Sequence, residues 1–376
     1  MKYFSFFFIT LCILSGIAYY QIPPDRQFDF IAKTADFTTQ RIYKKQDIPP
    51  PPNVKSAHSS TIAPIDSEYL ISAYFAGSRE GAKDVAIYAN IFHNNQWSEA
   101  FEILNPKQLM QDAKEYISKI GNPVLYHLDN TLHLFVVGVS IGGWATSKIY
   151  HYTSVANPQN IYFRFQKALH LSPFANLSNL VRTPPLGITF NDFQDKGFIL
   201  PIYHELANKY ALMVTFDTTG KKLQISKPNN AFGLLQPSIT ALDSTHCLIA
   251  FRAHKKARSI LYTQKCDNNL KYQPLQSANI PNEDNSLNLF AINNTAYLLH
   301  NTRIDNLPRG ELVISKLNYD NQFTKLLNID ETNTPNGEVS YPYIFISNGI
   351  LHITYTVDRK FIRHLMLSTH YLEEQP

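Results

Sequence analysis

Apolar and polar residues alternate in short runs along most of this chain, from about residue 54 onward. The runs are about four to eight residues long and are separated by clusters of Asn, Asp, Gly and Pro, as in half-buried strands joined by turns. The three- and four-residue spacing that marks a helix occurs over residues 109–120, where we expect one short helix on a loop. The pattern therefore predicts an all-β protein.

A short motif recurs at the start of six of these strands. It consists of a polar residue, a small residue or proline, any residue, and then Leu or Ile. The copies begin at Ser59, Asn122, Thr183, Gln236, Asn285 and Tyr341. A four-stranded unit that repeats about every 50 to 63 residues is typical of a propeller blade. We therefore expect a six-bladed β-propeller, in which the first residue of each copy points at one shared axial site.

The two ends of the chain are expected to close this ring. Residues 28–43 precede the first copy, and the last blade lacks an outer strand after residues 361–368. Pairing the two ends would remove exposed sheet edges. We expect residues 1–20 to be a signal peptide or an N-terminal membrane anchor, residues 21–53 a leader strand with a proline-rich linker, and residues 54–376 the propeller.

The N-terminus predicts export. Lys2 is followed by about seventeen mostly apolar residues and then a polar stretch, with Gly16-Ile17-Ala18 as a small-residue cleavage site. The run over residues 4–20 is also close to the roughly 20 residues that a spanning helix needs, so an uncleaved inner-membrane tether is the alternative. Cys12 lacks the small residue that precedes a lipoprotein cysteine. In both cases we expect the folded part to be periplasmic or secreted.

Composition supports a large core and argues against a nucleic-acid partner. The 376 residues are 44% hydrophobic and include 22 Tyr and 24 Phe, types that favour strands. The net charge of +4 is scattered, without a Lys/Arg cluster that could neutralise several phosphates. Cys247 and Cys266 flank a hairpin turn near Lys256, so they form either a disulfide across the ladder or two separate core thiols.

A crowded charged loop raises the question of a substrate. Charged residues make up only 17% of the chain, yet Arg79, Glu80, Lys83 and Asp84 fall within six positions between two apolar runs. A solvated β-turn is one explanation. The loop is expected at the inner end of the first blade, so the other explanation is that it handles an anionic ligand.

Several segments together resemble a known family. SAHSSTI…YFAGSREGAKDVAIY, GNPVLYHLDN…GVSIGGW, SPFANLSNLVRTPPL, LPIYHE, LQPSITAL…AFR and GEVSYPYIF…ITYTVDRKFIRH resemble the bacterial sialidase-like (neuraminidase-like, BNR-repeat) proteins, over about residues 47–372. Sialidases carry three arginines that clamp the substrate carboxylate, a tyrosine nucleophile with a glutamate partner, and an aspartate acid/base. The planar fork of Arg suits a carboxylate, and a tyrosine nucleophile is a known exception among glycosidases.

By position, the resemblance implies roles for five residues. Asp84 matches the acid/base, and Tyr341 matches the nucleophile. Arg252 and Arg309 match the second and third triad arginines, and Arg79 matches the arginine near the acid/base loop. Arg303, six residues before Arg309, is the alternative candidate for the third triad arginine.

The sequence departs from the family pattern at three places. His58-Ser59-Ser60 stands where the first triad arginine is expected, and Thr356 stands where the glutamate that braces that arginine is expected. Gln236 stands where the glutamate that activates the tyrosine is expected. Gln can orient a phenol but cannot take its proton. The coupled loss of an arginine and its brace suggests a site reshaped for a different anion.

Other residues are candidates by their place in the repeat. His204 and Glu205 are alternative bases for Tyr341, and Glu338 is an auxiliary acid/base. His58, Asn122 and Gln236 lie at blade openings, and the Trp144 indole could stack on a sugar. Arg359 and Arg363 on one face of an extended segment could supply the missing charge. Each of these side chains could equally be structural.

We therefore expect an exported sialidase-like glycoside hydrolase that cleaves a terminal acidic sugar and acts as a monomer. A polysaccharide lyase acting on a uronate-containing glycan is one alternative, with His58, His204 or Tyr341 abstracting a proton. A non-catalytic carbohydrate-binding propeller is the other. The sequence contains no metal or nucleotide motif, so no cofactor is expected.

Overall fold

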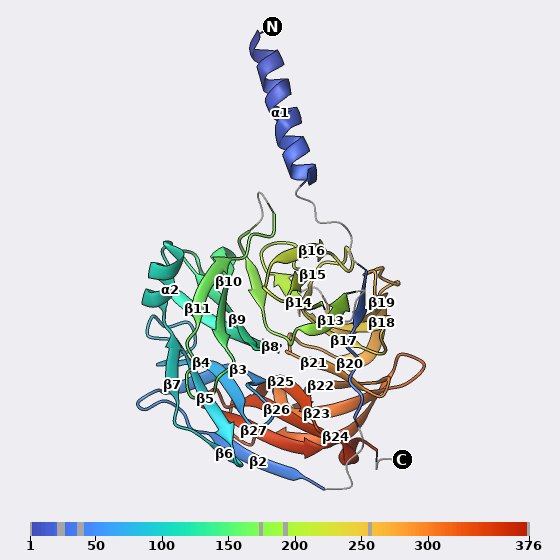
Figure 1. Ribbon diagram of the computed structural model, residues 1–376. Coiled ribbons are helices and arrows are strands. Elements are labelled where there is room, and N and C mark those ends of the chain that lie inside the picture. The colour runs from blue at the N-terminus through green and yellow to red at the C-terminus, as the bar shows by residue number, and fades with distance from the viewer. Residues whose placement is uncertain are drawn as a thin grey trace.

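A computed structural model of the chain describes residues 2–20, 27–35, 41–172, 176–190, 195–254 and 258–373. The strands form six antiparallel sheets, and Figure 1 shows them arranged in a ring with β3, β8, β17, β21 and β25 toward its middle. The six-bladed β-propeller predicted from the repeated motif is confirmed.

The first three blades follow one another along the chain. Blade 1 consists of β3 (Ser56–Pro64), β4 (Leu70–Gly77), β5 (Ala86–His93), β6 (Gln96–Trp97) and β7 (Phe101–Leu104). Blade 2 consists of β8 (Lys119–Leu128), β9 (Thr131–Val139), β10 (Ser147–Val155) and β11 (Arg164–Ala168). Blade 3 has an inner strand in two pieces and consists of β12 (Asn179–Val181), β13 (Leu186–Phe190), β14 (Lys196–His204), β15 (Tyr210–Asp217) and β16 (Lys222–Ser226).

The last three blades complete the ring. Blade 4 consists of β17 (Leu234–Ala241), β18 (His246–Ala253), β19 (Ile260–Asp267) and β20 (Gln276–Pro281). Blade 5 consists of β21 (Asn288–Ile292), β22 (Thr295–Ile304), β23 (Leu307–Leu317) and β24 (Phe323–Glu331). Blade 6 consists of β25 (Val339–Ser347), β26 (Ile350–Val357), β27 (Phe361–Ser368) and β2 (Tyr43–Ile48).

The ring closes by pairing the two ends of the chain, as the sequence predicts. β2 runs antiparallel to β27, with Tyr43 opposite Leu367, and the blue β2 lies beside the red β27 in Figure 1. The closing strand comes from the boundary between the expected leader strand and the proline-rich linker. An earlier part of the leader, β1 (Phe28–Phe30), pairs instead with β13 at the inner edge of blade 3.

The helices differ in part from expectation. The helix expected over residues 109–120 is α2 (Pro106–Ala113), because Asn105 caps its N-terminus by accepting from the Gln108 N–H, and Lys114 ends it in a left-handed conformation. Residues from Lys119 onward already belong to β8. At the N-terminus, α1 (Lys2–Tyr20) projects from the propeller in Figure 1. No helix within the described residues is long and apolar enough to cross a membrane.

The core lies between neighbouring sheets. Phe135 of blade 2, for example, packs against Phe198 and Phe216 of blade 3, with ring centroids 5.9 Å apart in both pairs. Cys247 and Cys266 face each other across β18 and β19 and form a disulfide. The structure therefore decides for the cross-ladder disulfide rather than two separate thiols. The predicted turn position, Lys256, lies outside the described residues.

Two stacked histidine pairs are buried inside the sheets. His133 Nδ1 lies 3.0 Å from His151 Nε2 in blade 2, and His352 Nδ1 lies 3.1 Å from His364 Nε2 in blade 6. Burial lowers the pKa of His133 and of His352 to about 4, and it also lowers the pKa of His151 and His364. These rings are therefore neutral near pH 7.

Acid is expected to destabilise the protein through these histidines. The unfolded chain takes up their protons near pH 6.5, well above the native-state pKa values. Above about pH 6.5 these histidines do not lower the free energy of unfolding. Between about pH 6.5 and 4 the free energy of unfolding declines, by up to ~1.4 kcal/mol per pH unit for each histidine. Urea unfolding across that pH range measures the decline.

The double variant His352→Gln/His364→Gln should lose less stability on acidification than the unmodified protein. Replacing the exposed His170 by Gln is the matched control and should leave the pH dependence as it was. If the free energy of unfolding falls equally steeply with pH in the double variant and the unmodified protein, the buried histidine pairs do not govern the loss of stability in acid.

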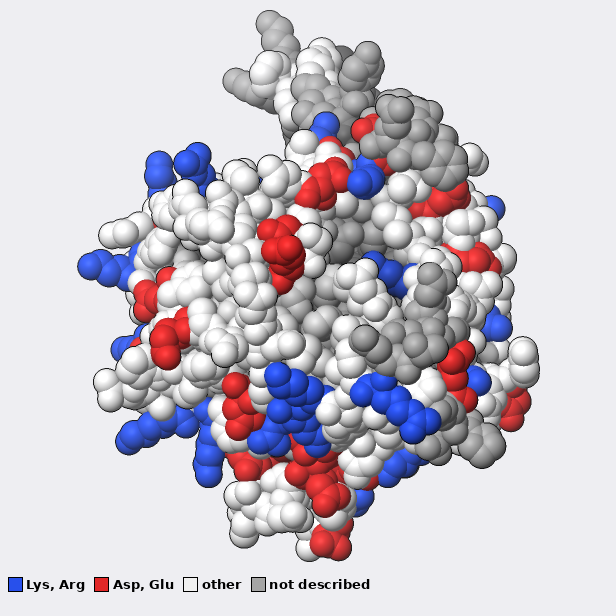
Figure 2. Space-filling model, turned by 60° about the horizontal axis from the view of Figure 1, so that its bottom comes forward, with Lys and Arg blue, Asp and Glu red and all other residues white. Residues whose placement is uncertain are grey.

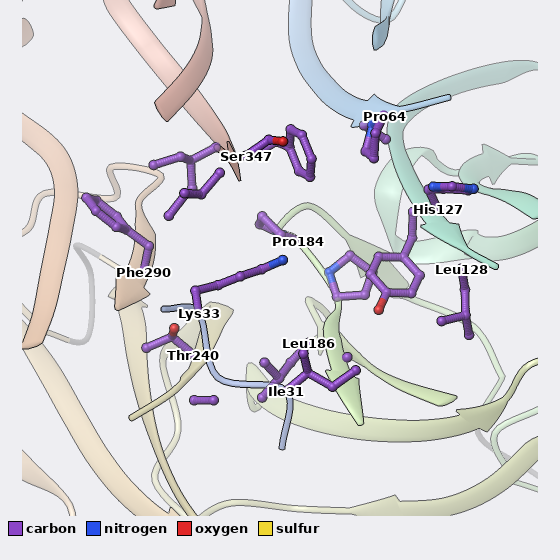
Figure 3. A pocket seen from close by; sticks show the side chains of 18 of the residues that line it. Ile31, Lys33, Pro64, His127, Leu128, Pro184, Leu186, Thr240, Phe290 and Ser347 are labelled. Atoms are coloured by element: carbon purple, nitrogen blue, oxygen red, sulfur yellow. The ribbon is translucent and has the colours of Figure 1, made fainter. Parts of the chain in front are cut away.

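The far end of the channel is an apolar pocket of about 610 Å³, formed by the C-terminal ends of the inner strands and by residues 31–33. Figure 3 shows the Lys33 side chain reaching into its middle. Lys33 is exposed within this opening, yet the surrounding protein lowers the pKa of its ammonium group by desolvation. This pocket is the end of the channel remote from the blade openings, so it does not contain the candidate catalytic groups.

Candidate active site

The repeated motif forms a β-bulge at the same place in four blades. Ser59, Asn122, Gln236 and Tyr341 all have positive φ, at 56°, 45°, 39° and 53°. The register of each inner strand shifts at that point. A non-glycine residue in this conformation is strained and persists where the surrounding structure holds it, often at functional sites. Four residues distant in sequence are thereby held at equivalent strand positions.

Tyr341 lies at the centre of the group. The ring of His58 contacts it edge-on, with centroids 4.4 Å apart. The guanidinium carbons of Arg182 and Arg309 each lie 5.3 Å from the centroid of the tyrosine ring. Burial would lower the pKa of Arg252, but the Tyr341 phenol and the Asp284 carboxylate outweigh it and raise that pKa. The structure therefore brings Arg252, Arg309 and Tyr341 together.

Both triad candidates are already engaged with acidic groups. Arg252 donates from Nε to Asp284 Oδ1 at 2.9 Å. Arg309 donates from Nη1 to Glu338 Oε2 at 3.2 Å and from Nη2 to the Asp284 carbonyl at 3.0 Å. Arg303, the alternative to Arg309, pairs with the exposed Glu283 instead. The arginines are thus oriented in advance, and part of their charge is offset.

Glu338 binds Arg309, which lies over the Tyr341 ring, and it also binds a third arginine. Its carboxylate accepts from the Ser340 hydroxyl at 2.7 Å and from Arg359 Nε at 3.1 Å. Burial would raise its pKa, but Arg309, His58 and Arg359 outweigh burial and lower it. Glu338 is therefore ionised, and its predicted role as an auxiliary acid would first require it to take up a proton.

Arg359 and Arg363 do not share a face, contrary to expectation. Arg359 has a φ of 55° in the turn between β26 and β27, so the segment is a hairpin and not a continuous strand. Arg363 lies on β27 and binds Asp47 at 2.7 Å and Asp330 at 2.9 Å, where the ring closes. Of these two arginines, Arg359 is the one that contributes charge to the site.

Arg182, which the sequence reasoning missed, is the innermost arginine. It is 1% exposed and donates to the carbonyl groups of Ser60, Tyr341 and Pro342. Burial lowers its pKa to about 10. The one available signal was an arginine in the apolar run LVRTPPL, immediately before the third copy of the motif.

Two departures from the family pattern are neighbours in space. The Ser59 N–H donates to Thr356 Oγ1 at 3.1 Å, so the missing arginine and its missing brace are replaced together by a small neutral pair. The Ser59 hydroxyl also donates to Asn122 Oδ1 at 3.3 Å. His58 is 1% exposed, and burial lowers its pKa to about 3. Neither ring nitrogen of His58 has a hydrogen-bond partner among the described residues.

Gln236 contacts a second buried phenol. Its Nε2 donates to the Tyr203 hydroxyl at 3.2 Å, and burial followed by the charge of Glu205 raises the pKa of Tyr203. Glu205 is partly exposed, with its carboxylate 4.0 Å from Lys209 Nζ. His204 stacks on Tyr210, and burial lowers its pKa. Glu205 therefore acts electrostatically on Tyr203, the phenol that Gln236 contacts.

The charged loop of blade 1 lies at the edge of the site. Asp84 is exposed and accepts from the Ser78 N–H at 2.9 Å and the Ser78 hydroxyl at 2.8 Å. Those hydrogen bonds, with a smaller effect of Arg79, lower its pKa. Among the described residues no contact joins Asp84 to Tyr341. Arg79, Trp144 and Arg359 line a pocket of about 630 Å³.

The site offers a phenol, several cations and ionised carboxylates. No group of three His, Cys, Asp or Glu side chains suited to a metal ion occurs within the described ranges. On the face shown in Figure 2, Lys and Arg side chains are interspersed with Asp and Glu. The arrangement can bind an anionic group and place an oxygen nucleophile beside it.

Comparisons with known proteins agree with this fold. The model of the BNR repeat-like domain family matches residues 68–353. Among curated proteins, no sequence matches this chain significantly. Trypanosoma rangeli sialidase superposes with a TM-score of 0.63 at 10% identity, over 91% of this chain and 61% of the sialidase. The chain thus spans about three fifths of the length of that structure.

Two further solved structures show the same likeness. The NanB sialidase from Streptococcus pneumoniae has a TM-score of 0.60 at 9% identity, over 91% of this chain and 71% of its own. The alpha-L-arabinofuranosidase arb93a from Fusarium graminearum has a TM-score of 0.60 at 12% identity, over 86% and 97%. These likenesses show a fold shared by glycoside hydrolases of two specificities. Because the family model spans most of the propeller, the chain belongs to the BNR repeat-like domain family.

Proposed function

We propose that this protein is an exported glycoside hydrolase that releases a terminal acidic sugar from a glycan. The observation that carries the proposal is the Tyr341 phenol, in contact with His58, Arg182 and Arg309 and paired electrostatically with Arg252. Arginine cations stabilise negative charge on a phenol oxygen, and their free N–H groups suit a sugar carboxylate.

In this proposal the Tyr341 oxygen forms a bond to the anomeric carbon while the glycosidic bond breaks. The neutral ring of His58 accepts the phenol proton, and Glu338 Oε1, 4.0 Å from His58 Nδ1, stabilises the resulting imidazolium. His58 and Glu338 would together take the role of the glutamate that activates the tyrosine in sialidases, since this chain has Gln236 at the position of that glutamate. A protonated Asp84, released from Ser78, would supply the proton to the leaving oxygen. Water then attacks the anomeric carbon, adds its hydroxyl to the sugar and gives its remaining proton to Asp84. The tyrosyl–sugar bond breaks as His58 returns the other proton to the Tyr341 oxygen.

Export is part of the proposal. The apolar N-terminal segment supports it, and so does the Cys247–Cys266 disulfide, since structural disulfides persist in oxidising compartments. The chemistry proposed for the propeller does not depend on whether residues 1–20 are removed.

The proposal is tested by incubating the purified protein with sialic acid-terminated, uronate-terminated and arabinose-terminated oligosaccharides and measuring the released monosaccharide by chromatography. Release of an acidic sugar is expected, with loss of about tenfold or more in kcat/KM for Arg252→Met because a charge-assisted contact to the carboxylate is removed. The exposed Arg164→Met is the matched control. Release of arabinose alone, or binding without any product, would contradict the proposed reaction.

A lyase is the second candidate, because His58 is neutral and its ring nitrogens have no hydrogen-bond partner among the described residues. A neutral imidazole can abstract the C5 proton of a uronate. The same assay separates the two reactions, since a lyase product is unsaturated and absorbs ultraviolet light, whereas hydrolysis consumes water and yields a saturated sugar.

A further inference from the structure

A basic pocket adjoins the tyrosine site. It is formed by the Arg79–Gly81 loop of blade 1, the start of β3, Lys119 at the start of β8, Trp144 in the short turn before β10, and the β26–β27 turn. Five of its side chains are basic and two are acidic; they are Lys55, Arg79, Lys119, Arg359, Lys360, Glu80 and Asp358. The chain as a whole has a net charge of only +4, so positive charge is concentrated here.

The carboxylates of this pocket are already engaged. Glu80 accepts from Arg359 Nη1 at 2.7 Å. Asp358 accepts from the hydroxyls of Thr332 and Thr334 at 2.8 and 2.7 Å. The pocket therefore keeps an excess of positive charge.

The three lysine cations have no such partner. The ammonium groups of Lys55, Lys119 and Lys360 form no hydrogen bond or ion pair with any described residue. Several like charges held close together repel one another, and an anion placed between them relieves that repulsion. The chemistry of the pocket therefore favours a negatively charged ligand.

The indole of Trp144 provides a flat wall for that ligand. The Cη2 edge of its ring lies against Gly121, where an added Cβ would meet the indole at 3.4 Å and Phe75 at 3.5 Å. Phe75 in turn packs edge-on against His58, with ring centroids 5.6 Å apart. An aromatic face beside a group of cations is suited to an anionic sugar ring, which is apolar on one face and charged at its edge.

Arg359 forms a wall common to this pocket and the tyrosine site. It lines the pocket and donates to Glu338, which binds Arg309 over the Tyr341 ring. A glycan whose terminal sugar contacts Tyr341 could thus place its next residue between Trp144 and the lysines.

We propose that the pocket is a second subsite that binds an anionic sugar residue, so that the preferred glycan carries negative charge on two neighbouring residues. The charge can be a carboxylate or a sulfate, since both present several oxygen acceptors to lysine. The inference rests on the proposed function only in taking the ligand to be a glycan with an acidic terminal residue.

The test uses the full chain carrying Tyr341→Phe, so that affinity is measured without turnover. Calorimetry compares an acidic monosaccharide with disaccharides and trisaccharides of three kinds, in which the second residue is uronate, sulfated or neutral. We expect the two acidic kinds to bind about tenfold or more tightly than the neutral kind at low salt, with the advantage shrinking as ionic strength rises.

Lys119→Ala/Lys360→Ala should remove about tenfold of the affinity for the acidic oligosaccharides and leave the monosaccharide affinity unchanged. Lys107→Ala/Lys271→Ala, at two exposed lysines outside the pocket, is the matched control and should bind like the parent. A preference for uronate or for sulfate identifies the source of the charge, and either preference supports the subsite.

Equal affinity for acidic and neutral oligosaccharides would overturn the inference, as would equal losses in the pocket variant and the control variant. Absence of binding to every acidic oligosaccharide would also overturn it. These outcomes are independent of the reaction, because a protein that binds acidic oligosaccharides through Lys119 and Lys360 but releases no sugar contradicts only the proposed hydrolysis.

Discussion

Tyr341→Phe is expected to lower kcat for acidic-sugar release on the order of a thousandfold or more, with the fold intact. The substitution removes only the phenol oxygen, which is the proposed nucleophile, and a nucleophile acts only in the reaction and not in packing. Phe keeps the aromatic ring that contacts His58, Arg182 and Arg309, and it loses the electrostatic contact of the phenol with Arg252. Steady-state kinetics with the best substrate from the panel measures the effect, and KM should change little.

Tyr319→Phe is the matched control, because Tyr319 is fully exposed on a distant hairpin. Tyr203→Phe is the more demanding comparison, since Tyr203 is the other phenol near the site and contacts Gln236. Tyr203→Phe should cost far less than Tyr341→Phe. If the two substitutions cost the same, or if Tyr341→Phe retains most of the activity, Tyr341 is not the nucleophile.

Arg182→Met is expected to lower the free energy of unfolding by roughly 3 kcal/mol or more. Arg182 comes from the start of blade 3, and its guanidinium joins carbonyl groups of blade 1 (Ser60) and blade 6 (Tyr341 and Pro342). Met fills a similar volume but leaves these acceptors buried and unpaired, which costs more than the relief from burying a charge. Urea unfolding followed by circular dichroism measures the loss.

Arg164→Met is the control, since Arg164 is exposed on β11 and its guanidinium lies over the ring of Tyr162. It should change stability by less than about 0.5 kcal/mol. A loss of similar size in both variants, or no loss for Arg182→Met, would show that Arg182 does not connect the blades. A loss of activity without a loss of stability would instead assign Arg182 to the ligand.

The repeated motif was informative because it has a local physical cause. A polar residue followed by a small residue or proline suits a bulge in which the first residue has positive φ, and four of the six copies have that conformation. Thr183 and Asn285 do not, because blade 3 divides its inner strand into β12 and β13 and β21 begins only at Asn288. The number of blades could therefore be counted from the sequence even where the local geometry varies.

Contacts between blades could not be predicted in the same way. Arg182, Glu338 and Arg359 lie far apart in sequence and gain their partners only when the inner strands surround one axis. The sequence could suggest Arg252 and Arg309 by position in the repeat, but not that Asp284 and Glu338 would already be bound to them. It also placed Arg363 at the site, whereas a hairpin turn carries that residue to the ring closure.

Sequence by itself determined the all-β class, the six blades and the closure of the ring, because alternation and turn residues act over a few neighbouring positions. Tertiary structure decided which charges meet around Tyr341, which carboxylates neutralise them and which lysines remain without a partner. Those outcomes depend on distances between separate blades and on burial, and no local pattern in the chain encodes either quantity.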